Sequence, residues 1–487
     1  MALLLSCSGS GDSSSGTPTS VPPTASAILY VKASNPGSGD AFGQAIAASA
    51  DGNTLAVGAR GEASNATGIN GNQTDNSAIN AGAVYIFTRD STGNVTETYV
   101  KASNTEAGDF FGSAVALSSD GNTLAVGAIG EASNATGING NQADNSTTFA
   151  GAVYIFTRNG SIWSQQAYVK ASNTARGDQF GTAVSLSADG STLAVGAIFG
   201  QILGDPAREG AAYVFTRSGG IWSQQAYLIA SNAEAGDFFG SGVALSADGN
   251  TLAVGAVFED SNATGVDGNQ ANNLASQSGA AYIFTRSGAV WSQEAYVKAS
   301  NTGAGDLFGY AVALSANGNT LAVGAYLEAS SATGINGNQA DNSAGSAGAA
   351  YVFTRTGTTW SQQAYVKSSN TDTGDGFGIS VALSADSNAL AIGAYTESSN
   401  ATGINGNQTD NSASQSGAAY TFTRSGNIWS QQDYVKASNT RLFDLFGISV
   451  ALSADGSVLA VGALDEDSNG SSQADNSTLN AGAVYIY

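Results

Sequence analysis

The chain has 487 residues and a formal net charge of −22, since 38 acidic side chains stand against 16 basic ones, and it contains no histidine. This charge argues against nucleic acid and anionic membranes as partners, because both bind positive surfaces. The lack of histidine removes Ser-His-Asp and Cys-His pairs and histidine metal sites, and no other catalytic constellation stands out. The 63 glycines and 42% hydrophobic residues are typical of a large all-β protein with many turns.

The chain begins with a short apolar run that ends in its only cysteine, Cys7. Residues 1–7 resemble a signal segment with the lipobox of bacterial lipoproteins, in which the cysteine becomes the acylated first residue, so we expect lipidation at Cys7. Residues 8–26 are rich in Ser, Thr and Pro, and we expect a disordered tether. The alternative is an incidental cysteine in a disordered tail. We expect an outer-membrane or cell-surface lipoprotein that contacts the membrane only through its lipid, or a secreted protein.

Seven Phe-Gly pairs divide the rest of the chain into repeats. Successive pairs lie 69 residues apart, except for one spacing of 59, and their phenylalanines are Phe42, Phe111, Phe180, Phe239, Phe308, Phe377 and Phe446. A fixed period of this length indicates a repeat architecture. Twelve of the sixteen basic residues also recur at two repeat positions, which spreads the positive charge around the molecule instead of forming a patch.

Each repeat contains four segments with the alternating pattern of β-strands. In the second repeat these are the Phe-Gly segment from Phe111, the Leu-Ala-Val-Gly-Ala segment, and residues 151–158 and 163–170. Asp120-Gly121 between the first two segments predicts a tight hairpin turn in which both residues have positive φ. The small residues of the second segment indicate close packing on both faces, as expected where sheets converge on an axis.

The two ends of the repeat region are complementary. The segment from Ile28 to Asn35 matches the end of a repeat, whereas the last repeat stops at Tyr487, within its third strand. The N-terminal strand would complete the last blade, while an open solenoid would need polar capping repeats that neither end resembles. We therefore predict that residues 27–487 form an all-β, seven-bladed propeller closed by the N-terminal strand, and we expect a monomer.

The Phe-Gly pair followed by Gly-Ala, seven times, resembles the FG-GAP repeats of integrin α-subunit N-terminal propellers and their bacterial relatives. The resemblance covers Ile28 to Tyr487 and implies a propeller used for binding or adhesion. In this chain the Gly-Ala pair is never followed by proline; the residues there are Arg60, Ile129, Ile198, Val257, Tyr326, Tyr395 and Leu464. The family's calcium loops between the first two strands are also absent, because the Ser-Ala-Asp-Gly-Asn-Thr turns offer too few oxygens.

An aspartate precedes each Phe-Gly pair, with one residue between them. These residues are Asp40, Asp109, Asp178, Asp237, Asp306, Asp375 and Asp444. They could be seven ligands around the channel, but we favour a structural role, in which each carboxylate accepts backbone N–H groups at a turn or pairs with a repeat arginine.

The long loops between the second and third segments are the candidates for a metal site. They carry hard oxygen donors of the kind that calcium prefers. The acidic candidates are Glu62, Asp75, Glu131, Asp144, Glu328, Asp341, Glu397 and Asp410. Calcium is the only cofactor we expect, and the alternative is that these loops are folded by Asx turns without a metal.

The recurrence of five tryptophans favours packing between blades over a carbohydrate platform; they are Trp163, Trp222, Trp291, Trp360 and Trp429. The leading functional hypothesis is a non-enzymatic cell-surface or secreted propeller that binds a protein or glycan through loops on one face. One alternative is a carbohydrate-active enzyme that uses paired loop carboxylates. The other is a structural protein of the envelope.

Overall fold

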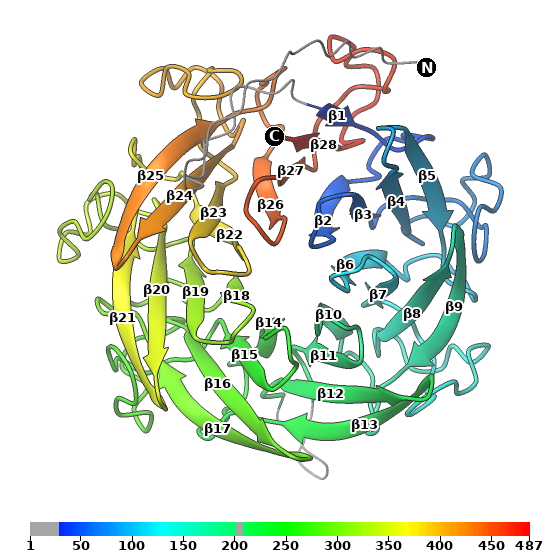
Figure 1. Cartoon of the computed structure of the whole chain (residues 1–487), viewed down its shortest axis with the longest axis horizontal. Helices are drawn as coiled ribbons and strands as arrows, with labels where there is room; N and C mark the ends of the chain where they lie inside the picture. Colours follow the sequence, from blue (N-terminus) through cyan, green and yellow to red (C-terminus); the bar gives the residue numbers. More distant parts are fainter. Residues whose placement is uncertain (1–28, 201–207) are drawn as a thin grey trace, which may run out of the picture.

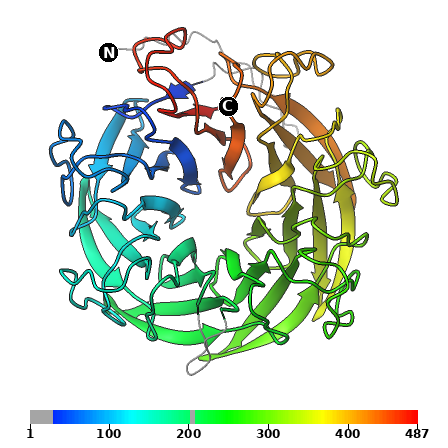
Figure 2. The same cartoon turned by 180° about the vertical axis from the view of Figure 1, so that it is seen from behind.

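The computed structural model describes residues 29–200 and 208–487, and these form seven four-stranded antiparallel sheets arranged around a central axis (Figures 1 and 2). The all-β, seven-bladed propeller predicted from the repeat period is confirmed. Within these ranges no helix is long and apolar enough to cross a membrane. Cys7 and the segment 8–26 lie outside the described residues.

Each blade contains one strand of each repeat segment, and the Phe-Gly strand lies nearest the axis (Figure 1). The first strands are β2 (Phe42–Ala48), β6 (Phe111–Leu117), β10 (Phe180–Leu186), β14 (Phe239–Leu245), β18 (Val312–Leu314), β22 (Phe377–Leu383) and β26 (Phe446–Leu452). The second strands are β3 (Thr54–Ala59), β7 (Thr123–Ala128), β11 (Thr192–Ala197), β15 (Thr251–Ala256), β19 (Thr320–Ala325), β23 (Ala389–Ala394) and β27 (Leu459–Ala463).

The third and fourth strands form the outer half of each blade. The third strands are β4 (Ala83–Arg89), β8 (Ala152–Asn159), β12 (Ala211–Ser218), β16 (Ala280–Ser287), β20 (Ala349–Thr356), β24 (Ala418–Ser425) and β28 (Ala483–Ile486). The fourth strands are β5 (Val95–Val100), β9 (Ile162–Val169), β13 (Ile221–Leu228), β17 (Val290–Val297), β21 (Thr359–Val366), β25 (Ile428–Val435) and β1 (Leu29–Val31). We number the blades from 1 (β2–β5) to 7 (β26–β28 with β1).

The turn between the first and second strands differs from the predicted two-residue hairpin. In blade 2, Gly121 has a φ of +64°, but Asp120 is not among the residues with positive φ. The turn is longer, since the Gly121 N–H donates to the Ser118 carbonyl at 2.9 Å and the Ser118 N–H donates to the Thr123 carbonyl at 2.9 Å. The Asp120 carboxylate instead accepts bonds from the Ser118 hydroxyl and the Asn122 N–H. The Asp120 carboxylate thus holds the turn by hydrogen bonds, and only Gly121 takes the left-handed conformation that was predicted for both residues.

The glycine of the Phe-Gly pair permits neighbouring blades to meet through their backbones. Gly112 has a φ of +91°, and a Cβ atom there would lie 2.4 Å from the carbonyl oxygen of Ala83 in blade 1. The preceding Phe111 donates its N–H to the Ala81 carbonyl of blade 1 at 2.9 Å. A side chain at this position would force the blades apart, which explains why glycine recurs in all seven repeats.

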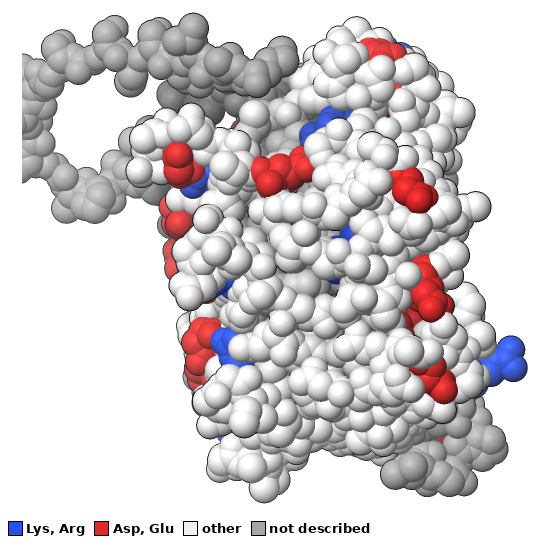
Figure 3. Space-filling view, turned by 90° about the vertical axis from the view of Figure 1, so that its right-hand side faces the viewer, with Lys and Arg blue, Asp and Glu red and all other residues white. Residues whose placement is uncertain are grey.

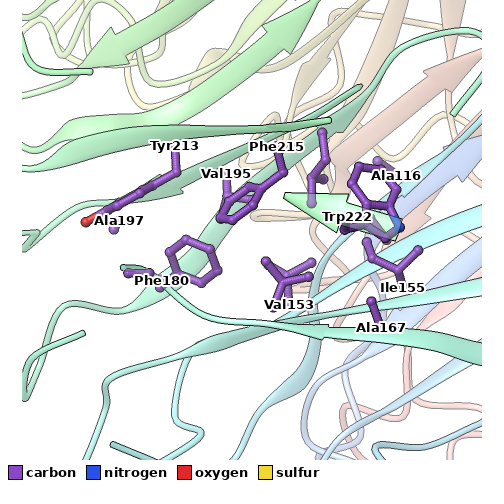
Figure 4. Close-up of a cluster of buried hydrophobic side chains, with 14 of the residues drawn as sticks. Ala116, Val153, Ile155, Ala167, Phe180, Val195, Ala197, Tyr213, Phe215 and Trp222 are labelled. Carbon is purple, nitrogen blue, oxygen red and sulfur yellow. The ribbon is translucent and has the colours of Figure 1, made fainter. Parts of the chain in front are cut away.

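The hydrophobic core is divided among the seven interfaces between neighbouring blades. At the interface of blades 2 and 3, Val153 and Ile155 of β8 pack against Phe180, Val195 and Phe215 of the next blade (Figure 4). Each blade thus buries its apolar side chains only against its neighbours, so a gap at any point of the ring would expose two apolar faces.

The N-terminal strand closes this ring. Strand β1 pairs with β28, and Leu29 lies opposite Ile486. Two side-chain contacts join the same ends. Lys32 Nζ lies 2.9 Å from a carboxylate oxygen of Glu466, and the Tyr30 hydroxyl donates to the same side chain at 3.0 Å. In most other blades the equivalent contacts form between residues of one repeat. Residues more than 400 positions apart therefore complete blade 7.

Deleting residues 27–35 should strongly destabilise the protein. The deletion removes β1, exposes the edge of β28 and leaves Glu466 buried without its cation. We expect aggregation or loss of cooperative melting, measured by circular dichroism and light scattering. Deleting residues 8–26 is the matched control and should change neither quantity. Equal stability of the two truncations would contradict closure by β1.

Candidate functional site

The segments between the second and third strands, which we call the inserts, join corresponding strand ends and therefore emerge on one face of the ring, the insert face. Five inserts have the same length, at 60–82, 129–151, 257–279, 326–348 and 395–417. The insert of blade 7, at 464–482, is shorter, and that of blade 3 runs from 198 to 210 with residues 201–207 outside the description. In side view, acidic side chains stand along both edges of the ring wall, and the wall between them is largely uncharged (Figure 3).

A buried ion pair lies beneath six of the seven inserts. In blade 1, Lys101 Nζ lies 2.7 Å from Glu62 Oε2, and both side chains are at most 1% exposed. Tyr99 donates its hydroxyl to Glu62 Oε1 at 2.9 Å. The same pair recurs with distances between 2.7 and 3.0 Å at Lys170–Glu131, Lys298–Glu259, Lys367–Glu328, Lys436–Glu397 and Lys32–Glu466. Burial lowers the pKa of each lysine, and the neighbouring glutamate opposes that shift.

An asparagine from the preceding blade joins each of these pairs to the next interface. Asn35, which follows β1 in blade 7, donates to Glu62 Oε1 at 3.3 Å, and its own side-chain oxygen accepts the hydroxyl of Tyr85. In blade 2, Asn104 makes the corresponding bonds, to Glu131 at 3.3 Å and from Tyr154 at 2.6 Å. Both carboxylate oxygens of the glutamate therefore accept hydrogen bonds from other residues of the propeller. Because one donor comes from the preceding blade, the insert is bound to two blades.

Blade 3 shows how closely the two charges depend on each other. Its insert is ten residues shorter, its sequence has Gly200 where the other blades have glutamate, and Ile229 occupies the position of the lysine. A lysine retained alone would be a buried, unpaired cation. This joint loss was visible in the sequence, and it is the signal that could have identified the pair before the structure did.

The structure separates the glutamates and aspartates that we considered together as calcium ligands. Glu62, Glu131, Glu328 and Glu397 all lie in the buried ion pairs. The aspartates are exposed at the insert surface, where they accept backbone N–H bonds within their own loops: Asp75 from Ser77, Asp144 from Ser146, Asp341 from Ser343 and Asp410 from Ser412. Across residues 29–200 and 208–487, no group of three or more Asp, Glu, His or Cys side chains is arranged to hold a metal ion.

The aspartate before each Phe-Gly pair has the structural geometry expected from the sequence. Each carboxylate accepts the backbone N–H three residues earlier at 2.7 to 3.1 Å, as Asp40 does from Gly37 and Asp109 from Glu106. Burial raises the pKa of these carboxyls, and the backbone hydrogen bond lowers it in part. The net value is about 6 at Asp40, about 7 at Asp109 and about 8 at Asp444.

The tryptophans pack between blades, as expected. Trp222 of blade 3 is 3% exposed and donates its indole N–H to Gln166 of blade 2 at 2.9 Å. The repeat arginine lies over the ring, with the Arg217 guanidinium carbon 5.4 Å from the centroid. In this cation–π contact the arginine covers one face of the tryptophan ring, and its charge is engaged by the ring. These five aromatic residues therefore offer no platform for a ligand.

Two hollows among the described residues are large enough to consider as ligand sites. The first strands enclose a central channel of about 310 Å³, lined by residues such as Ser113, Thr182 and Ile379. A second recess, of about 470 Å³, lies where the shorter insert of blade 7 meets blade 1, between Asn35, Gln73 and Asn469. The channel volume is at the lower end of the range found for small-molecule sites.

The fold and the inter-blade geometry define a closed β-propeller built from units that run from the fourth strand of one blade to the third strand of the next. A family model described as FG-GAP repeat matches six such units, at residues 96–156, 163–215, 222–284, 291–353, 360–422 and 429–487, and the chain belongs to that family. No curated protein matches the chain. Among solved structures, the Cps50 (Swd1) β-propeller domain of Myceliophteria thermophila is similar, with a TM-score of 0.51 and 10% identity over 94% of this chain and 98% of that one. That likeness concerns the fold alone.

Replacing the buried lysine alone should cost more than replacing the pair. Lys101→Ile leaves Glu62 buried without a cation, and we expect a loss of roughly 3 to 5 kcal/mol in the free energy of unfolding, measured with urea. The double variant Lys101→Ile/Glu62→Gln removes both charges, as blade 3 does, and should recover a large part of that loss. Additive costs of Lys101→Ile and Glu62→Gln would contradict a coupled pair.

The raised pKa values of the repeat aspartates should make the protein more stable at pH 5 than at pH 8. These carboxyls ordinarily titrate at 3.8, but in the fold Asp109 titrates at about 7 and Asp444 at about 8. Between these values the folded state binds more protons than the unfolded state, so their stabilising contribution is complete below pH 3.8 and is lost as the pH rises through 6 to 8. Melting temperatures at constant ionic strength measure the effect, and Asp444→Asn should reduce it. A melting temperature that rises from pH 5 to pH 8 would contradict this assignment.

Proposed function

We propose that this protein is a non-enzymatic binding or adhesion propeller that recognises a protein or a glycan through its insert face. The observation that carries the proposal is the contrast between what repeats and what does not. The repeated charges and aromatic rings are engaged within the fold, as in the pairs Lys101–Glu62 and Arg217–Trp222. Some exposed side chains of the insert face, such as Ile79 and Phe149, differ from repeat to repeat, although the Gly-Ile-Asn-Gly-Asn-Gln stretch of the long inserts is nearly identical.

Several of these exposed side chains are large and apolar. Ile79 is 68% exposed, Leu274 77% and Leu479 62%, and Phe149 is 44% exposed. Other repeats carry Ser or Asn at the equivalent positions, for example Ser414 in place of Ile79 and Asn80 in place of Phe149. The fold does not require apolar residues there, which supports their use in contacts with another molecule.

The setting that we propose is the cell surface or the surrounding medium. The cysteine-containing N-terminus supports a lipid anchor at Cys7, and palmitate labelling of the full chain tests it. Calcium enters the proposal only through the exposed aspartates of the inserts, such as Asp75 and Asp144, because the glutamates are held by lysines.

The test is binding of the labelled propeller, residues 27–487, to a glycan array and to intact cells, each in calcium and in EDTA. The insert-face variant Ile79→Ser/Phe149→Asn/Leu274→Ser/Leu479→Ser borrows residues from other repeats and should lose binding at least about tenfold, since each anchor removes buried contact area. Binding that depends on calcium would assign a role to the exposed aspartates.

A matched control changes the opposite face. Ile162, Ile221, Val290 and Ile428 are at least 70% exposed at the hairpins between the third and fourth strands, and blade 5 has Thr359 at this position. Replacing all four with threonine should leave binding unchanged. Loss of binding in this control, with retention in the insert-face variant, would move the site to the other face. Absence of any binding by the wild type would overturn the proposal.

A further inference from the structure

The mouth of the central channel on the insert face breaks the sevenfold repetition. The residue that follows Gly-Ala is apolar and aliphatic in blades 2, 3, 4 and 7, but it is Arg60 in blade 1, Tyr326 in blade 5 and Tyr395 in blade 6. The residue that follows Phe-Gly is small or aliphatic in most blades, as at Ser113 and Ile379, but it is Tyr310 in blade 5. Three tyrosines and one arginine are thus introduced where the fold accepts serine or isoleucine.

The structure brings these side chains together with one acid. The rings of Tyr310 and Tyr326 meet edge to face with centroids 4.7 Å apart, and Tyr326 lies 6.2 Å from Tyr395. Across the mouth, Arg60 interacts electrostatically with both Tyr310 and Asp465 of blade 7. Residues from blades 1, 5, 6 and 7 therefore form one group, the mouth cluster: Arg60, Tyr310, Tyr326, Tyr395 and Asp465.

Tyr310 lies next to the channel-lining Ala311 and remains open to solvent. It is 41% exposed, yet the surrounding protein atoms raise the pKa of its hydroxyl, an effect increased by Tyr395 and opposed by Arg60. Ala311, the residue after Tyr310, lines the central channel of about 310 Å³ together with Ser113, Thr182 and Ile379, the equivalents of Tyr310 in other blades.

The backbone of blades 5 and 6 is altered to accommodate these rings. Strand β18 covers only Val312–Leu314, whereas the other first strands have seven residues, and Tyr310 precedes this shortened strand. In blade 6, the residue before Phe377 is Gly376, at a position where blade 4 has Phe238. A Cβ atom at Gly376 would lie 2.6 Å from the ring of Tyr395. The glycine thus leaves room for the tyrosine.

The chemistry of the mouth cluster selects among ligands. A cationic group would meet Arg60 at the rim, and an anionic group would meet Asp465 and a chain of net charge −22. A purely apolar ligand would desolvate the Arg60 and Asp465 side chains without replacing their hydrogen bonds with water. A neutral ligand with hydroxyl groups and C–H faces satisfies all five residues, since tyrosine rings pack against C–H faces while Arg donates to and Asp accepts from hydroxyls.

We propose that the mouth cluster binds a neutral sugar residue of a glycan, with Tyr310 as the stacking surface and Arg60 and Asp465 as the hydroxyl-binding pair. This assignment rests on the proposed function, because it specifies the ligand class and the place on the same face. Ala311, next to Tyr310, lines the central channel, so a sugar bound at the cluster lies at the end of this channel.

The test uses residues 27–487 and a panel of neutral tetrasaccharides built from glucose, galactose, mannose or N-acetylglucosamine, with uronic-acid tetrasaccharides as the charged comparison. Binding is measured by calorimetry and by saturation-transfer NMR. The variants Tyr310→Ser, Tyr395→Ile and Arg60→Ile each introduce a residue that another repeat carries at the same position. We expect a neutral sugar to bind the wild type and each variant to bind it about tenfold more weakly, without a change in melting temperature.

The control variant Thr182→Ser changes the residue equivalent to Tyr310 in blade 3 and should bind like the wild type. Binding of neutral sugars that survives all three variants would overturn this location but leave a glycan-binding propeller. Binding to a protein on intact cells without any sugar binding would overturn the sugar assignment and leave the proposed function in place. Preference for uronic acids would overturn the assignment of a neutral sugar. A wild type that binds nothing on the array, on cells or in the panel would overturn both the sugar assignment and the proposed function.

Discussion

The structure depends on one buried contact that holds each long insert to its blade. A lysine after the fourth strand meets a glutamate after the second, as Lys101 meets Glu62, and tyrosine and asparagine donors complete the shell of the carboxylate. Burying such a pair gives little net stability, because desolvation offsets the attraction, but breaking it is costly. We interpret the pair as a device that sets where each insert begins and that joins it to the preceding blade. Blade 3, which has a short insert, has neither charge.

The same contact explains the closure of the ring. Blade 7 is formed from the two ends of the chain, and Lys32 and Tyr30 bring to Glu466 the groups that other blades take from their own fourth strand. The hydrophobic cores lie between blades, so none of the seven interfaces can be left open without exposing apolar faces. Because β1 contributes only three residues of strand pairing, the ion pair and the bonds made by Asn35 add contacts that fasten this short strand.

The symmetry of the repeat separates what the fold needs from what it tolerates. Tryptophans, repeat arginines and the aspartates before Phe-Gly recur because each makes an equivalent contact in its repeat, as Trp222 does with Gln166 and Asp109 does with the Glu106 N–H. At the channel mouth, and at the insert residues just before the third strand, the sequence varies instead. Variation in a ring of nearly identical blades therefore marks the surfaces available for recognition, which is why Tyr310 and Arg60 carry more functional information than the far more frequent repeat residues.

The sequence by itself determined the architecture, since the seven Phe-Gly pairs, the four strand patterns and the split last repeat follow from periodicity, which is a local and additive signal. It also indicated that the aspartates before Phe-Gly are structural. It did not reveal that Glu62 pairs with Lys101 while Asp75 points to solvent, because both lie in one acidic loop and their separation depends on a strand 39 residues away. The turn at Asp120 was predicted with the wrong geometry, because a side-chain hydrogen bond replaces a backbone conformation. Only the tertiary structure decided which residues surround the channel, since Arg60, Tyr310 and Asp465 come from three different blades and meet only when the ring closes.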